Sequence, residues 1–146
     1  MRAVLDTNVL ISALIIGRKP RKLMNALLGA RHTLILSEHI VAEFSLVSSH
    51  DKIKRYVDDD DVASFLGAVL SRATFAVPKG TVQVLGDADD DVLDAARAGD
   101  ADILVTGDKH LLELGKFGRT KVVTVNEALT LLRRQKGVRG PRVRSN

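Results

Sequence analysis

The sequence predicts an α/β domain with a central parallel sheet. Short apolar segments alternate along the chain with longer segments whose apolar residues recur at helical spacing. The short segments are apolar throughout, which is typical of strands that are covered by helices on both faces. Strands that alternate with helices are joined by crossover connections, so they are expected to run parallel.

The first predicted elements are a strand and two helices. Residues 2–6 (RAVLD) form the strand, and residues 7–14 begin the first helix. The second helix covers residues 20–30, with Pro20 in its first turn and Gly29 close to its end, where these residue types are favoured.

The middle of the chain continues the alternation. Residues 32–37 form a strand, and Ser37 caps a following helix. One face of that helix is apolar, with Ile40, Phe44 and Val47 at helical spacing. Residues 58–70 form another helix with acidic residues at its positive N-terminus, and residues 75–77 form a short strand.

The C-terminal half has the same pattern. The predicted helices are residues 90–99, 109–115 and 126–135, and the predicted strands are residues 102–108 and 121–125. The sequence contains no internal repeat and no linker within these elements, so a single domain is expected.

Composition limits the class of protein. The chain has 146 residues, of which 45% are hydrophobic, and this is enough for one globular domain with a core. It contains no cysteine, which excludes disulfides and thiolate metal sites. Its apolar runs are too short to span a membrane, and its start does not resemble a signal peptide. A cytoplasmic protein without a membrane anchor is expected.

Net positive charge is predicted to lie at the C-terminus. After Glu127, the last acidic residue, the chain carries six of its 22 basic residues, which leaves 16 basic against 18 acidic residues elsewhere. Residues 1–136 are predicted to be the folded domain, with no evident basic patch. Residues 137–146 are predicted to be a flexible basic tail, either solvated or in contact with a phosphate backbone.

Asp6 is the first candidate for a functional residue. It lies between apolar residues that are expected to be buried, where an unpaired carboxylate costs several kcal/mol. It comes directly after the apolar residues 3–5 of the first predicted strand, and Asp108 ends the predicted strand and turn of residues 102–108. Because functional groups gather beyond the carboxyl ends of parallel strands, these two carboxylates are expected to lie together.

Two further acidic positions are candidates for the same site. Glu43 lies beside the buried face of its predicted helix, although an isolated helical Glu is usually solvated. The run DADDD, residues 87–91, has four Asp residues at the start of a helix, more than capping requires. The residues alone leave open which of these Asp residues joins the site.

Carboxylates gathered in this way repel one another, and a hard divalent cation is the usual compensation. Mg²⁺ binds oxygen ligands and is typically held by few carboxylates beside a substrate phosphate. Such a site supports the attack of a metal-activated water on a phosphodiester. The four histidines show no metal-ligand spacing; His110 follows Asp108 closely, but it is expected to be a surface residue.

Three segments carry a resemblance to a known family. VLDTNVLISAL, ILSEHIVAEF and DADDDVLDAARAGDADILVTGDKHLL resemble the motifs of PIN-domain ribonucleases, in particular the VapC-like toxins of toxin–antitoxin pairs. The resemblance runs from Met1 to about Leu132. It implies a three-layer α/β/α fold, an acidic pocket that binds Mg²⁺ or Mn²⁺, and metal-dependent endonucleolytic cleavage of RNA.

The resemblance assigns roles position by position. The metal-binding and catalytic carboxylates would be Asp6, Glu43, Asp90 and Asp108. Asp90 is preferred within the run DADDD because Leu93 and Ala96 would then be buried, and Asp91 and Asp89 are the alternatives. Asn8 and Thr106 match polar positions that support the carboxylates by hydrogen bonding, and Asp91 is a further supporting candidate. Thr7 is expected to be a turn residue. The resemblance also implies a cognate antitoxin that covers the acidic pocket, and a homodimer.

Other functions are kept as alternatives. Within the same fold they are an RNA-processing or quality-control nuclease without an antitoxin, and a non-catalytic RNA- or protein-binding module. A haloacid-dehalogenase-type phosphotransferase is disfavoured, because it needs a second Asp where this chain has Asn8. A receiver-like phosphoacceptor domain is disfavoured because no adjacent acids follow the first strand.

Overall fold

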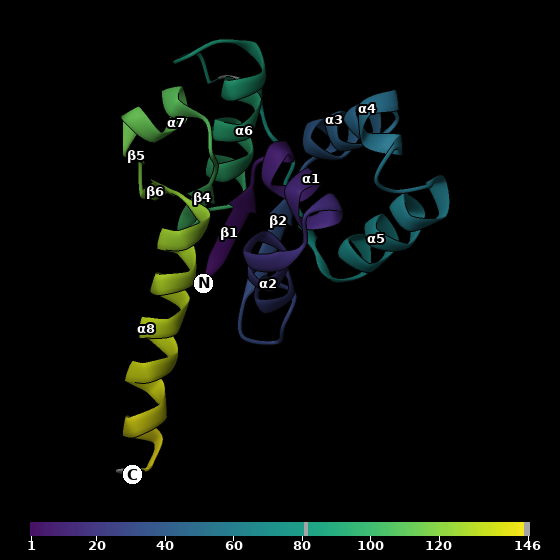
Figure 1. Ribbon diagram of the computed structural model, residues 1–146. Coiled ribbons are helices and arrows are strands. Elements are labelled where there is room, and N and C mark those ends of the chain that lie inside the picture. Colours follow the sequence, from purple (N-terminus) through teal and green to yellow (C-terminus); the bar gives the residue numbers. More distant parts are fainter. Residues whose placement is uncertain (81, 145–146) are drawn as a thin grey trace.

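The computed structural model describes residues 1–80 and 82–144, apart from the side chains of 87–88 and 136–144. Within these residues six strands form one sheet in the order β3-β2-β1-β4-β6-β5 (Figure 1). The strands are β1 (Arg2–Leu5), β2 (Thr33–Leu36), β3 (Thr74–Phe75), β4 (Ile103–Val105), β5 (Lys116–Phe117) and β6 (Thr120–Val123). The predicted α/β class and the central parallel sheet are confirmed.

The pairing is parallel everywhere except at one edge. β1 lies in the centre, with β2 on one side and β4 on the other, and both pairs are parallel. β5 pairs antiparallel with β6, which the sequence does not predict. β5 is only two residues long, too short for its side chains to show a strand period.

Helices cover the strands. They are α1 (Thr7–Ile15), α2 (Arg18–Leu27), α3 (Glu38–Ser48), α4 (Asp51–Lys54), α5 (Asp59–Arg72), α6 (Asp87–Ala98), α7 (Lys109–Leu114) and α8 (Val125–Arg144). Figure 1 shows α3, α4 and α5 on one side of the molecule and α7, β5 and β6 on the other. The short helix α4 is not predicted from the sequence.

The core lies on both faces of the sheet. Ala3, Val4 and Leu5 are all fully buried, although consecutive strand residues point to opposite faces. β2 has the same pattern in residues 34–36. α6 packs against β1, β2 and β4, and α8 packs against β4 and α2. Layers on both faces therefore explain why these strands are apolar throughout.

α8 extends beyond the domain that the sequence predicts. Its backbone is helical from Val125 to Arg144, and Figure 1 shows its C-terminal half leading away from the other elements. Flexibility of residues 137–146 stays a prediction, since the side chains there and residues 145–146 lie outside the description. Among the helices that are described, none has the length and apolar character needed to cross a membrane.

Candidate active site

Asp6 stands at the carboxyl end of the central strand. Its backbone N–H continues the ladder by donating to Val105 O (3.0 Å), and its carboxylate caps α1, where Oδ1 accepts from Thr7 N (2.8 Å). The other oxygen, Oδ2, accepts from Thr106 Oγ1 (2.8 Å). The residue is only 9% exposed, so these two donors hold a nearly buried charge.

The surroundings of Asp6 disfavour its ionised form. Burial raises the pKa of the Asp6 carboxyl, and the charges of Glu43 and Asp108 raise it further. The hydrogen bonds from Thr106 and Thr7 act in the opposite direction, but they do not cancel the effect of burial. Asp6 is therefore a carboxylate that the fold holds in place without fully compensating its charge.

Thr106 connects the ends of two neighbouring strands. Its side chain is buried, and its hydroxyl donates to Asp6 Oδ2 while it accepts from Asp108 N (3.0 Å). β1 and β4 are parallel and paired in register, Leu5 with Val105, so the residues that follow them meet at one sheet edge. Asp108 then begins α7, where its Oδ1 accepts from His110 N (2.7 Å).

Glu43 reaches the same edge from α3. The Thr7 hydroxyl donates to Glu43 Oε1 (2.6 Å), which ties α3 to the start of α1. α3 also packs against α6, so Glu43 faces the region between the sheet edge and α6. The Thr7 hydroxyl thus does more than close a turn: it positions a carboxylate. The Asn8 side chain is exposed and makes no hydrogen bond within the described part of the chain, so the supporting role falls to Thr7 instead.

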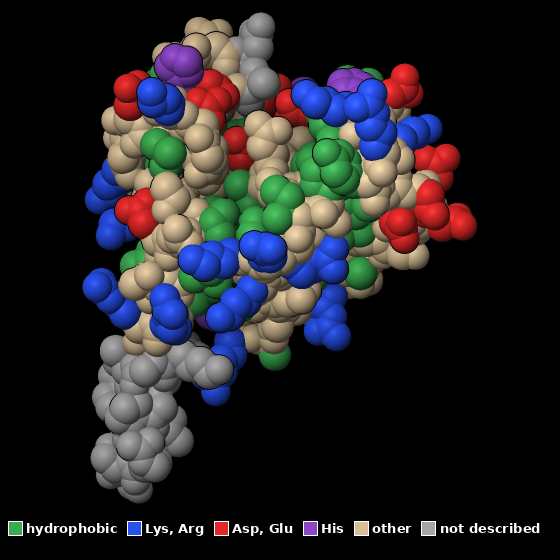
Figure 2. Space-filling view, viewed as in Figure 1, with side chains coloured by type: hydrophobic (Ala, Val, Ile, Leu, Met, Phe, Trp, Pro, Cys, Tyr) green, Lys and Arg blue, Asp and Glu red, His purple; other side chains and the backbone are tan. Residues whose placement is uncertain are grey.

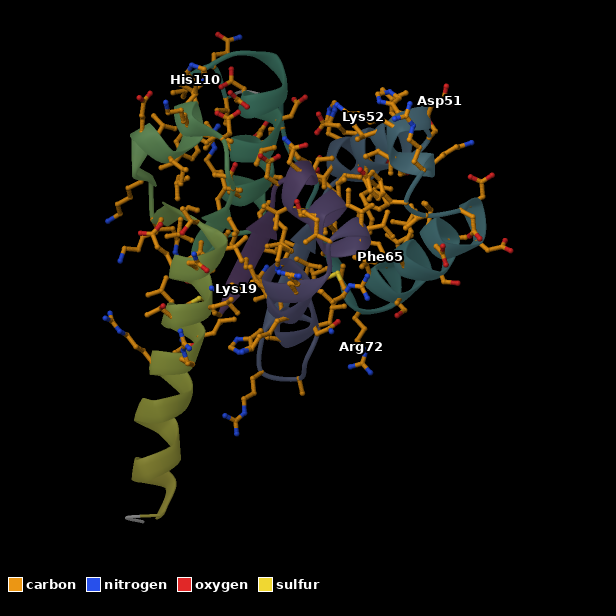
Figure 3. The ribbon with its side chains drawn as sticks, in the orientation of Figure 1. Lys19, Asp51, Lys52, Phe65, Arg72 and His110 are labelled. Carbon is orange, nitrogen blue, oxygen red and sulfur yellow. The ribbon has the colours of Figure 1, made fainter. Side chains whose placement is uncertain are left out.

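Asp89 completes the cluster from α6. Its carboxylate, that of Asp108 and the imidazole of His110 each offer one ligand atom, and these three atoms lie within 4.8 Å of one another. Partial burial raises the pKa of Asp89, and the nearby charges of Asp108, Asp90 and Glu43 raise it as well, while His110 lowers it. Figure 2 shows acidic side chains gathered over α6 and α7, and Figure 3 shows His110 at the same end.

The structure does not place Asp90 in the cluster. Its carboxylate turns back to the preceding loop and accepts from the backbone N–H groups of Val84 (2.9 Å), Leu85 (2.8 Å) and Gly86 (3.0 Å). These amides lower the pKa of Asp90, as expected for a carboxylate whose charged form is hydrogen-bonded. The structure therefore places Asp89, which the sequence left as an alternative, beside Asp108 and turns Asp90 away from it; the identity of the ligand stays a prediction.

The remaining candidates lie at the rim. Asp91 is close to His39, with Oδ2 3.5 Å from Nδ1, and both residues line a cavity of about 270 Å³ that Glu43 also borders. His110 was expected to be an ordinary surface residue, and although exposed it has Nδ1 3.6 Å from Asp108 Oδ1. The one feature of the sequence that points to His110 as part of the site is its position two residues after Asp108.

The cluster has the donor set of a site for a hard cation. No Lys or Arg within the described residues forms an ion pair with Asp6, Glu43, Asp89 or Asp108. Four carboxylates from four elements are thus left with hydroxyls, backbone amides and one imidazole as neighbours. Carboxylate oxygens are the ligands that Mg²⁺ and Mn²⁺ prefer, so the residues present fit such an ion.

Comparisons with known proteins agree with this architecture. One chain of the crystal structure of VapBC2 from Rickettsia felis, bound to a DNA fragment from their promoter, matches with a TM-score of 0.60 and 20% identity. The match covers 85% of this chain and 98% of that one, and at such low identity it shows a shared fold. No curated protein matches the sequence significantly. The family model of the PIN domain matches residues 2–110, and the chain therefore belongs to the PIN domain family.

Proposed function

We propose that this PIN domain is a metal-dependent endoribonuclease that hydrolyses RNA phosphodiesters at the cluster of Asp6, Glu43, Asp89 and Asp108. The observation that carries the proposal is the convergence of these four carboxylates without a Lys or Arg partner among the described residues. Such an arrangement destabilises the fold, because like charges at a partly buried site repel one another. Its presence therefore favours a function that requires the carboxylates.

Asp6, Asp89 and Asp108 would hold the metal ion, with Glu43 as a further ligand or as the group that orients water. A bound Mg²⁺ or Mn²⁺ would supply a water of lowered pKa and would stabilise the leaving oxygen of the phosphodiester. The imidazole of His110 lies beside Asp89 and Asp108, where it would contribute to the same site.

The chain's own contribution is to hold these groups in place. Two hydrogen bonds fix the direction of the Asp6 carboxylate, and Thr106 ties it to the backbone of Asp108. Thr7 does the same for Glu43. Because these donors belong to buried or partly buried residues, the carboxylates are oriented before any ion or substrate arrives.

We further propose that the protein is the toxin component of a toxin–antitoxin pair. Support comes from the PIN domain itself and from the fold shared with a chain of VapBC2. A cognate antitoxin would cover the acidic cluster, and an arginine from it would offset the charge. The protein would act in the cytoplasm as a homodimer.

The test is the cleavage of a mixed RNA substrate by the wild type and by Asp6→Asn, each with Mg²⁺, with Mn²⁺ and with EDTA. Asp60→Asn, which removes an exposed carboxylate on α5, is the matched control. We expect cleavage by the wild type and the control that requires metal and is absent in Asp6→Asn. Equal cleavage by all three proteins, or cleavage in EDTA, would refute the proposal.

The toxin assignment has its own test. Expression of the wild type in a host without its partner is expected to stop growth, whereas Asp6→Asn is expected to be harmless at the same protein level. Normal growth with an active nuclease would indicate an RNA-processing enzyme instead.

A further inference from the structure

Two segments of the chain contain basic residues and no acidic ones. Residues 7–37 carry five Lys and Arg, and residues 128–146 carry six. Together they hold half of the 22 basic residues and none of the 18 acidic ones. The rest of the protein is therefore strongly acidic, and charge is divided between two parts of the sequence.

The fold brings the two segments together. α2 packs against α8, and Lys19 Nζ donates to Asn126 Oδ1 (3.2 Å) between them. A cavity of about 570 Å³ opens where α2 ends against α8, and Lys22, Arg31 and Arg133 are among its lining residues. Arg72 of α5 reaches the same region and donates to Leu28 O (3.4 Å).

These residues form one surface, which we call the basic face: Lys19, Lys22, Arg31, Arg72 and Arg133. Figure 2 shows Lys and Arg side chains gathered across the lower part of the view, and Figure 3 shows Lys19 and Arg72 far from His110. The body of the protein thus has a basic patch that the sequence did not suggest, because its parts are distant along the chain.

The cations of the basic face are open to an external anion. Each is exposed, although Lys19 and Arg72 make the single hydrogen bonds given above and Arg133 donates to Thr130 Oγ1 (3.4 Å). None of the five forms an ion pair with a carboxylate of the described residues. Arg119 shows the contrast, since it is paired with both Asp100 and Asp102.

We propose that the basic face binds the phosphate backbone of RNA, at a place separate from the acidic cluster. The inference rests on the proposed function only in taking RNA as the polyanion. Surfaces that bind nucleic acid are polar and strongly positive, whereas protein interfaces are enriched in aromatic residues as well as in Arg. Neither acid-free segment contains a Phe, Tyr or Trp, so the surface favours RNA over an acidic protein.

The position of the basic face sets a minimum length for an RNA that contacts both the face and the acidic cluster. Arg31 lies in the connection that leads into β2, at the amino ends of the strands, whereas the acidic cluster lies at their carboxyl ends. A four-residue strand such as β1 spans about 13 Å. An RNA must therefore extend well beyond the cleaved bond to reach both, and the face would recognise backbone without reading base sequence.

The test is binding in EDTA, where no cleavage occurs. The probe is a labelled RNA hairpin of about 20 nucleotides, titrated at several salt concentrations. The face variant replaces three exposed cations with glutamine: Lys22→Gln, Arg31→Gln and Arg133→Gln. The control variant loses three exposed cations elsewhere: Lys52→Gln, Lys79→Gln and Lys116→Gln.

We expect the face variant to bind at least about tenfold more weakly, and the slope of log K against log salt to fall by about 2 to 3. The control is expected to change the slope by less than about 1. Equal losses in both variants would overturn the proposal, because binding would then follow net charge alone. A poly-glutamate peptide that displaces the RNA and also depends on the three face cations would assign the surface to an acidic protein instead.

This result is independent of catalysis. A wild type that binds through the face but never cleaves would end the nuclease proposal and leave the present one standing. If the wild type cleaves RNA but the face variant binds RNA equally well, the nuclease proposal stands and the proposal of an RNA-binding face is refuted.

Discussion

Substituting Asp6 by Asn is expected to stabilise the protein while it removes activity. The wild-type carboxylate is nearly buried, and burial together with Glu43 and Asp108 raises its pKa. The ionised form is thus costly in the folded state at neutral pH. Asn has nearly the same shape and carries no charge, so it relieves this cost without leaving a cavity.

The size of the effect follows from two opposed contributions. The net cost of burying an ion without a partner is several kcal/mol, and hydrogen bonds to a charged group return about 1.5–3 kcal/mol each. Asn keeps a neutral acceptor for one of the two donors, Thr7 N and Thr106 Oγ1, and turns an NH2 group, which cannot accept a hydrogen bond, towards the other. We expect a net gain of about 1–2 kcal/mol, which for a chain of this size raises the Tm by roughly 3–6 °C.

The gain should depend on pH with a defined sign. Since the folded pKa of Asp6 lies above its unfolded value, the folded state retains the proton longer than the unfolded state does. The contribution of Asp6 to stability is then lost as pH rises through the folded pKa. The difference between Asp6→Asn and wild type should be smallest below the ordinary Asp pKa of about 4 and should grow as pH rises through the folded pKa.

The measurement is thermal and urea unfolding of both proteins in EDTA from acid to neutral pH, with Asp60→Asn as the exposed control. Adding Mg²⁺ should then raise the Tm of wild type and leave Asp6→Asn unchanged, because binding to the folded state stabilises it. A loss of stability in Asp6→Asn larger than in the control would show that Asp6 is a structural residue, and the argument from uncompensated charge would be wrong.

Three other predictions address the supporting groups. Thr106→Val should lower stability by about 1–2 kcal/mol in urea unfolding and slow cleavage by about 10- to 100-fold, whereas Thr130→Val, which removes an exposed hydroxyl, should do neither. Asp89→Asn should weaken Mn²⁺ binding in a calorimetric titration at least tenfold, and Asp90→Asn should leave it nearly unchanged; the opposite order would restore Asp90 as the ligand. Deleting residues 137–146 should weaken RNA binding and flatten its salt dependence, and an unchanged slope would mark the tail as a passive end.

The sequence was most informative at the ends of the strands. Asp6 and Asp108 each follow a short apolar run, and parallel strands necessarily end at the same edge of the sheet. The contact of Thr106 with both residues follows from that register. The hydrophobic pattern was sufficient for Asp6 and Asp108 because it predicts the strands, and the pairing of those strands fixes where the following residues lie.

Pattern was insufficient within the run of aspartates on α6. Successive residues of a helix are rotated by about 100°, so a shift of one position changes the direction of a carboxylate completely. Leu93 and Ala96 are buried, as expected, but they lie four and seven residues after Asp89, on its own face of the helix. The periodicity that was used to choose Asp90 therefore suits Asp89 better, and the loop amides that bind Asp90 were not visible in the sequence.

The hydrogen bond from Thr7 to Glu43 could not be predicted for a related reason. Both residues lie in the first turn of α1, and either side chain can support a carboxylate. Which of them faces α3 depends on how two helices pack, and local sequence does not determine that. The basic face could not be predicted for the same reason, since four of its five cations come from two segments that are brought together only by the packing of α2 on α8.

The hydrogen bond between Thr106 and Asp6 joins residues that lie 100 positions apart, and this separation has a consequence for biosynthesis. A nascent chain that has not yet formed β4 already carries Asp6 and Glu43. It lacks the Thr106 hydroxyl that orients Asp6, and it lacks Asp108, beside which Asp89 lies in the folded protein. At about 5–20 residues per second, a ribosome needs roughly 7–30 s to complete the chain, and through most of that time no assembled site exists. Truncated or stalled products therefore lack the assembled cluster, and under the proposed function they would not cleave RNA.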